Sequence, residues 1–131
     1  IAYLNSKGLE YKDYGTYDTA ATDYPIYAKR VAKAIQNDEC EKGILICGTG
    51  IGISIAANKV KGVRCGLCTS VEMAHLTKQH NNANMISLGE RIVGVELAKD
   101  ILDSFFGAEF EGGRHARRVD KITAIEGKYN K

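Results

Sequence analysis

Short apolar runs alternate with amphipathic segments along most of the chain, and this alternation restricts the folds that it can adopt. The apolar runs lie between turn-forming residues, at 43–48 (GILICG), 63–68 (VRCGLC) and 84–89 (NMISLG). Such short runs are typical of strands that are covered on both faces. The segments between them carry apolar residues at helical spacing. The pattern therefore predicts an α/β fold with an open, mainly parallel sheet.

The predicted sheet is Rossmann-like, with helices on both faces, and 131 residues suit a single domain of this kind. The expected helices lie at 26–37, 53–59, 70–81, 95–110 and from about 117 onwards. Near the start of the chain, residues 1–4 have the pattern of the last turns of a helix that Gly8 ends. Residues 9–15 then alternate in a way that predicts a further strand.

The charge balance and the apolar content exclude some classes of partner. The 18 basic and 16 acidic residues leave a net charge of +2, which gives no general affinity for nucleic acid. No apolar run approaches the roughly 20 residues that a membrane-spanning helix needs. The four cysteines lie mostly inside apolar runs and not in a loop-rich disulfide framework. We therefore expect a cytoplasmic protein with no nucleic-acid or membrane partner.

The most informative motif, CGTGIG at 47–52, follows the first apolar run. Ligands bind beyond the carboxyl ends of strands in open parallel sheets, so this loop is a candidate site. Three glycines permit close approach of a ligand to backbone amides at a helix start: Gly48, Gly50 and Gly52. Cys47 stands at the edge of this candidate oxyanion cradle, and Thr49 lies inside it. A thiol near a helix start has a lowered pKa, so Cys47 is either a base or nucleophile or a buried structural cysteine.

Two common nucleotide-binding motifs do not fit this loop. A dinucleotide fingerprint needs its third glycine one residue later, where Ile53 stands. It also needs an acidic residue after the next strand, where Cys68 and Thr69 stand. A phosphate-binding P-loop needs a Gly-Lys-Ser/Thr ending, which is missing. The sequence therefore predicts no nucleotide cofactor.

Cys65 and Cys68 have the spacing of a redox pair or of half a zinc site. Positions three apart in a strand point to opposite faces, however, and no second cysteine pair is present to complete a zinc site. We interpret both as structural residues and Cys40 as a loop residue. A metal site is not predicted.

Three polar residues around the third apolar run are candidate substrate contacts. His80 and Asn81 stand at a predicted helix end, where a capping or surface role is the common alternative. Arg91 follows the run and is either an anion contact or the ion-pair partner of Glu90 or Glu96.

Arg114 and Arg118 form a more specific signal, in the segment GGRHARRV. They are four residues apart and share a face if the segment is helical. Two neighbouring guanidinium groups suit a phosphate dianion. The alternative is a solvated basic helix start, which the helix dipole disfavours.

Four stretches together resemble the B-type ribose-5-phosphate isomerases in register and order: DYP, GILICGTGIGISIAANKVKGVRCGLC, HNNANMISLGERIVG and EFEGGRHARRV. The resemblance runs from about residue 9 to the C-terminus. The related subunits of galactose-6-phosphate isomerase share the cysteine–glycine loop. They do not typically carry the His-Asn pair or the GGRHxxR segment, so the resemblance favours the pentose enzyme.

The resemblance implies interconversion of D-ribose 5-phosphate and D-ribulose 5-phosphate without a metal or any other cofactor. It implies that Cys47 is the base that moves a proton between C2 and C1, and that the backbone of residues 48–52 holds the enediolate oxygen. His80, with Thr49 nearby, is implied in opening the furanose ring. The other implied contacts are Tyr24 and Asn81 in the sugar pocket, and Arg114 and Arg118 at the phosphate.

The family shares its pocket across a dimer interface, which implies a homodimer or a dimer of dimers here. Family members begin with a strand that ends in a Gly-Ser-Asp-His-like turn, whose Asp and His contact the sugar and the phosphate. The sequence shows no such segment. We therefore expect the sugar-phosphate isomerase domain at 1–131 to lack this strand and turn.

Three functions stay open on the residues alone. The first is isomerisation of ribose 5-phosphate, or of a six-carbon aldose phosphate such as allose 6-phosphate. The second is a non-catalytic sugar-phosphate sensor, in which the arginines matter and Cys47 does not. The third is a thiol redox protein that uses Cys65 and Cys68.

Overall fold

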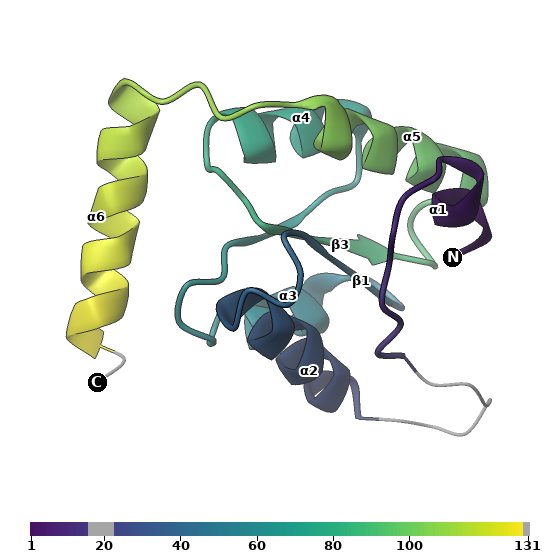
Figure 1. Cartoon of the computed structure of the whole chain (residues 1–131), viewed down its shortest axis with the longest axis horizontal. Helices are drawn as coiled ribbons and strands as arrows, with labels where there is room; N and C mark the ends of the chain where they lie inside the picture. The colour runs from purple at the N-terminus through teal and green to yellow at the C-terminus, as the bar shows by residue number, and fades with distance from the viewer. Residues whose placement is uncertain (16–22, 130–131) are drawn as a thin grey trace.

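The computed structural model describes residues 1–15 and 23–129, and Figure 1 shows how they are arranged. Each of three strands is followed by a helix, as the sequence predicts. The elements are, in order, α1 (Ala2–Ser6), α2 (Tyr24–Gln36), β1 (Gly43–Cys47), α3 (Ile51–Ala57), β2 (Cys65–Leu67), α4 (Val71–Gln79), β3 (Met85–Gly89), α5 (Val95–Gly107) and α6 (Arg114–Tyr129).

The sheet is parallel and has the strand order β1-β3-β2, so β3 is its central strand. Gly43 at the start of β1 lies opposite Met85, and Cys47 at its end lies opposite Gly89. All five residues of β3 are buried, as expected for a strand with neighbours on both edges and helices on both faces. The register brings Cys47 and Gly89 together at the carboxyl edge of the sheet.

Helices cover both faces of the sheet, which confirms the predicted architecture (Figure 1). On one face, α2 and α3 enclose a core that includes Leu45 of β1 and Met85 of β3. On the other face, α4 and α5 enclose Ile86, Leu88 and the fully buried Phe105. The alternation of side chains along β3 therefore divides its apolar residues between the two cores.

Local signals mark the ends of three helices where the sequence places them. Pro25 lies in the first turn of α2, where its missing N–H costs no helical hydrogen bond. Ser70 caps α4, because its side chain accepts a hydrogen bond from the Met73 N–H at 3.1 Å. Gly8 follows α1 with a φ of +69°, the left-handed conformation that ends a helix.

Two expectations about the elements are wrong. Residues 9–15 form no strand, because no neighbouring strand offers them the hydrogen bonds that a strand needs. The last helix begins at Arg114 and not near residue 117. Gly112 and Gly113, with φ of +75° and +57°, make the turn immediately before it.

Helix α6 stands at one side of the molecule (Figure 1). The Gly62 N–H donates a hydrogen bond to Glu126 Oε1 at 3.0 Å and connects the helix to the segment before β2. Ile122 and Ile125 on this helix remain 48% and 60% exposed, so part of its apolar face is uncovered. Within the described part of the chain, no helix has the length and apolar character to cross a membrane.

Candidate active site

Cys47 begins a loop whose backbone is turned back toward its sulfur. The Gly50 N–H donates a hydrogen bond to Cys47 Sγ at 3.1 Å. Gly50 has a φ of +80°, and a Cβ there would lie 2.7 Å from Leu67 Cδ1, so this position requires glycine. An N–H donor stabilises negative charge on the atom that it faces. The loop therefore places a backbone N–H donor directly against the sulfur of Cys47.

The end of β3 packs directly on this loop. The Glu90 N–H donates a hydrogen bond to the Cys47 carbonyl at 2.9 Å. A Cβ at Gly89 would lie 2.5 Å from the Thr49 carbonyl oxygen, so the strand and the loop approach too closely for a side chain. The end of β3 and the Cys47 loop are therefore in direct backbone contact at the carboxyl edge of the sheet.

Arg91 lies beside the same loop. Its N–H donates a hydrogen bond to the Gly48 carbonyl at 3.0 Å, and its Nε would lie 3.4 Å from a Cβ at Gly48. Glu96 forms its ion pair with Lys99, and among residues 1–15 and 23–129 Arg91 has no carboxylate partner. The guanidinium group is therefore available to an anion, which favours the anion-contact interpretation of the sequence.

The loop also depends on Ser87, a residue that the sequence interpretation missed. Ser87 is fully buried in β3, and its hydroxyl donates a hydrogen bond to the Gly50 carbonyl at 3.0 Å. Thr49 Oγ1 accepts a hydrogen bond from the Ile51 N–H at 3.2 Å and holds the start of α3. The sequence does contain a signal for this contact, a serine inside the apolar run NMISLG. A buried hydroxyl needs a hydrogen-bond partner.

Backbone donors remain available around Cys47. Among the described residues, the N–H groups of Gly48, Thr49 and Gly52 donate to no protein acceptor. The Tyr24 ring lies against Gly52, where a Cβ would be 2.6 Å from its hydroxyl oxygen. Tyr24 is 45% exposed, so a ligand can reach it. Unpaired backbone amides that face one small space can stabilise a developing oxyanion.

The remaining candidate residues gather around the start of α6. His80 ends α4, and its ring stacks on that of His115 with the ring centroids 4.1 Å apart and the planes 8° apart. Arg114 and Arg118 lie one turn apart on α6, as the helical interpretation predicts. Asn81 lines a cavity of about 440 Å³ between the β2 region and α6. His80 thus lies at the end of α4, as the sequence predicts, and also belongs to a cluster of basic residues with His115, Arg114 and Arg118.

These two groups of residues lie at opposite ends of the sheet. Cys47 is at the carboxyl end of β1, whereas His80 precedes Met85, which lies opposite Gly43 at the amino end. A strand of five residues spans roughly 13 Å. The expected position of Thr49 near His80 is therefore not met within one chain.

Cys65 and Cys68 do not form a reactive pair. Cys65 packs with the core on the α2 side of the sheet and Cys68 with the core on the α4 side, so they point to opposite faces as predicted. Burial raises the pKa of Cys65 to about 12 and that of Cys68 to about 11. Both thiols stay protonated near neutral pH, which favours their structural interpretation over a redox role.

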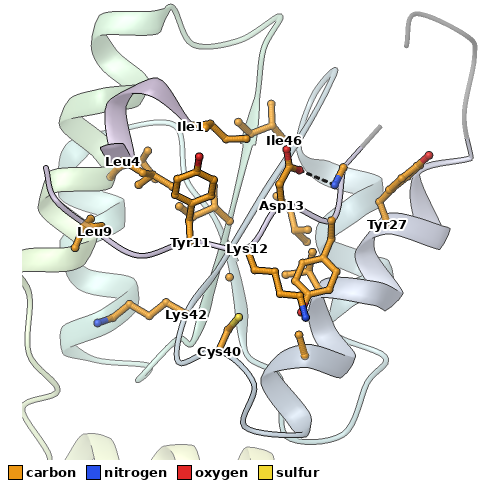
Figure 2. A pocket seen from close by; sticks show the side chains of 18 of the residues that line it. Ile1, Leu4, Leu9, Tyr11, Lys12, Asp13, Tyr27, Cys40, Lys42 and Ile46 are labelled. Carbon is orange, nitrogen blue, oxygen red and sulfur yellow. Dashed lines mark hydrogen bonds between the residues drawn. The ribbon is translucent and has the colours of Figure 1, made fainter. Parts of the chain in front are cut away.

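A groove of about 1090 Å³ runs along the outer edge of β1 (Figure 2). Residues 9–15 form its opposite side, and α1 and α2 also contribute to it. The Gly43 N–H and the Cys47 carbonyl bond to the β3 side, so the alternate backbone groups at Ile44 and Ile46 face the groove. Ile46 is 58% exposed, so the expectation of a strand covered on both faces is wrong for the end of β1.

Comparison with known proteins identifies related sequences over nearly the whole chain. A family model described as ribose/galactose isomerase matches residues 1–122. Ribose-5-phosphate isomerase B of Escherichia coli (strain K12) is 52% identical over 130 residues, which are 99% of this chain and 87% of that protein. D-erythrulose-4-phosphate isomerase of Pectobacterium atrosepticum is 46% identical over 126 residues, which are 95% of this chain and 82% of that protein.

A solved structure shows the same fold. Ribose-5-phosphate isomerase B of Clostridium thermocellum aligns with a TM-score of 0.96 and 52% identity. The alignment covers 98% of this chain and 86% of that one. The similarity therefore extends over both groups of candidate residues.

Proposed function

The chain belongs to the ribose/galactose isomerase family, and from this premise we propose that it interconverts D-ribose 5-phosphate and D-ribulose 5-phosphate. The observation that carries the proposal is the Cys47 loop, where a sulfur and unpaired backbone amides share one small space. The similarity to ribose-5-phosphate isomerases B at 52% identity supports the choice of substrate. Four free cysteines also support a reducing, cytoplasmic environment.

The proposed chemistry is a proton transfer between two neighbouring carbons. Cys47, as the thiolate, removes the proton from C2 of the open-chain aldose and returns it to C1. The electron pair left at C2 forms the enediolate, and the negative charge that develops on O1 is stabilised by the loop amides of Gly48, Thr49 and Gly52. A proton moves from the C2 hydroxyl to O1 to complete the ketose. These steps need no metal and no other cofactor.

His80 and Asn81 are proposed to act before this step, on the cyclic sugar. An imidazole can exchange the proton between the anomeric hydroxyl and the ring oxygen, which opens the furanose. Tyr24 and Arg91 border the Cys47 loop and can contact the sugar from that side. The phosphate then fixes the sugar through charged contacts far from the reacting carbons.

The site is proposed to form between two copies of the chain. His80 and Asn81 lie at the amino end of the sheet and Cys47 at the carboxyl end, so a partner subunit has to bring them together. Exposed apolar side chains at both ends support such an interface: Ile51, Ile55, Ile92 and Val95 follow β1 and β3, and Ile122, Ile125 and Tyr129 lie on α6. A two-fold axis would place the carboxyl end of each subunit's sheet against the amino end of its partner's sheet. This arrangement would complete two equal sites.

The substrate assignment is tested by comparing sugar phosphates of different length, with EDTA present. We expect the highest kcat/KM for ribose 5-phosphate, and unchanged turnover after EDTA treatment. A higher value for a six-carbon aldose phosphate, or for the four-carbon sugar named for the Pectobacterium relative, would reassign the substrate. Ligand binding without turnover of any of these sugars would indicate a sensor.

Replacing Arg114 with alanine is expected to raise KM for ribose 5-phosphate strongly, with a smaller effect on kcat. The substitution removes a charged hydrogen-bond partner of the phosphate, worth about 1.5 to 3 kcal/mol, or about tenfold to 150-fold in KM. Lys128→Ala is the matched control, because Lys128 is an exposed cation at the opposite end of the same helix. Steady-state kinetics measure both, and equal KM values would place the phosphate elsewhere.

The groove beside β1 is proposed to receive an extended strand that runs parallel to β1. Its edge presents the free backbone groups of Ile44 and Ile46, and residues 9–15 lie on its other side without a ladder partner. A parallel strand in this position would end next to Cys47. In the family that the chain resembles, such a strand ends in a Gly-Ser-Asp-His-like turn that contacts the sugar and the phosphate.

A synthetic peptide tests this proposal. A peptide of alternating β-branched residues that ends in Gly-Ser-Asp-His is expected to raise the Tm of the chain, because a ligand at 100 times its Kd stabilises the folded state by about 2.7 kcal/mol. The control peptide carries proline at a central position, where it cannot complete a ladder. Differential scanning calorimetry measures the shift, and an equal effect of both peptides would contradict strand pairing.

A further inference from the structure

The ring of His80 lies flat against the ring of His115 where α4 meets the start of α6. The ring centroids are 4.1 Å apart and the planes are 8° apart. His115 is buried, with 4% of its surface exposed, whereas His80 is half-buried. His115 therefore covers one face of the His80 ring, and the rest of that ring stays partly open to solvent.

Backbone hydrogen bonds hold the main chain on both sides of this stack. The Glu111 N–H donates to the Gln79 carbonyl at 3.0 Å, which connects the segment before α6 to the residue before His80. His115 lies in the first turn of α6, where its N–H donates to the Gly112 carbonyl at 3.0 Å. The two rings are thus brought together by the backbone, independently of any substrate.

The stack is the restraint that the structure shows on the His80 side chain. Among the described residues, the ring nitrogens of His80 take part in no hydrogen bond or ion pair with protein. An imidazole at a helix end can adopt several rotamers when no partner selects one of them. Stacking on a buried, fixed ring selects the plane in which the His80 nitrogens lie.

We propose that His115 is a positioning residue for the opening of the sugar ring, because its ring holds the His80 imidazole in the orientation that reaches the substrate. This inference rests on the proposed function. In that step the anomeric hydroxyl loses its proton, the C1–O4 bond breaks and O4 gains a proton. A displacement of about 1 Å in a group that transfers protons can cost about 100-fold in rate. His115 acts only through His80.

The environment of His115 suits packing and not proton transfer. Its Nε2 lies 3.7 Å from Glu111 Oε1 and has no hydrogen-bond partner. Burial, followed by the nearby charge of His80, lowers the pKa of His115, so this ring is neutral near pH 7. A neutral ring adds no positive charge beside a His80 ring that gains a proton during the reaction.

Two substitutions of His115 isolate the effect of stacking. His115→Phe keeps a flat ring and His115→Leu does not, whereas both remove the ring nitrogens. We expect His115→Leu to lower kcat for ribose 5-phosphate by about tenfold to 100-fold, with a smaller change in KM, and His115→Phe to retain most of kcat. His75→Leu is the matched control, since His75 is an exposed histidine on α4 outside the stack. Equal losses in the Phe and Leu variants would overturn the proposal.

Hydrogen exchange on ribulose 5-phosphate distinguishes lost positioning from a damaged fold. This ketose has no furanose form, because its O5 carries the phosphate. Exchange of a C1 hydrogen in deuterium oxide therefore needs the Cys47 step and no ring opening. We expect His115→Leu to keep the exchange rate of wild type, measured by proton NMR, while its turnover of ribose 5-phosphate falls. A parallel loss of exchange and turnover would contradict a positioning role.

The stack itself is measured by NMR without substrate. The ring current of His115 is expected to displace the His80 ring protons upfield in wild type. This displacement should persist in His115→Phe and disappear in His115→Leu, and unchanged signals in His115→Leu would refute the inference. If the signals respond as expected but wild type neither isomerises nor exchanges any sugar phosphate, the proposed function fails, whereas absence of the stack leaves the isomerase standing. The two failures are therefore distinguishable.

Discussion

Replacing Cys47 with alanine is expected to lower kcat for ribose 5-phosphate isomerisation by about 100-fold to 10,000-fold, the usual contribution of a positioned general base. The loss follows from the position of Cys47 Sγ, which accepts the Gly50 N–H at 3.1 Å and borders the unpaired loop amides. Affinity for a phosphate-bearing ligand is expected to stay nearly unchanged, because the proposed phosphate contacts, Arg114 and Arg118, lie on α6.

The measurement combines steady-state kinetics with calorimetric binding of a non-isomerisable pentose phosphate. Cys40→Ala is the control, since it removes a partly buried thiol that lies outside the loop. Loss of activity in Cys47→Ala with retained binding would support the base assignment. Substantial turnover in that variant would contradict it, and loss of both activity and binding would indicate that the loop had collapsed.

The elements of the fold could be predicted because their signals are local. Pro25, the Ser70 cap and the left-handed Gly8 each mark a helix end through contacts with near neighbours. The apolar runs of the three strands were equally clear. The prediction of a strand at 9–15 is wrong for a non-local reason. Alternating side chains give a segment two faces, but the segment joins a sheet only if a neighbouring strand offers it backbone hydrogen bonds.

The sequence allowed the candidate site residues to be named one by one, but it gave no information on their arrangement. The glycines after β1 indicated the cradle, and the structure adds the reason for Gly89, which the Thr49 backbone approaches too closely for a side chain. Ser87 and His115 were missed, because each depends on a distant partner, the Gly50 carbonyl and the ring of His80 respectively. The sequence also could not show that Cys47 and His80 occupy opposite ends of the sheet.

Two inactive variants are expected to restore activity when they form mixed dimers. Cys47→Ala and His80→Ala each damage both sites of their own homodimer. If each site takes Cys47 from one subunit and His80 from the other, a mixed dimer holds one intact site and one site with both substitutions. Random assortment of equal amounts makes half of the dimers mixed, so about a quarter of the wild-type activity should return.

The recovery is measured by unfolding the two variants together, refolding them and assaying isomerisation. The control mixes Cys47→Ala with the double variant Cys47→Ala/His80→Ala, in which no subunit supplies a base and no activity should appear. A site built within one chain would leave every site with one substitution and give no recovery in either mixture. The arrangement of the sheet opposes that outcome, because β3 begins at the end near His80 and finishes at the end near Cys47. Recovery near a quarter would therefore establish the shared site and the homodimer together.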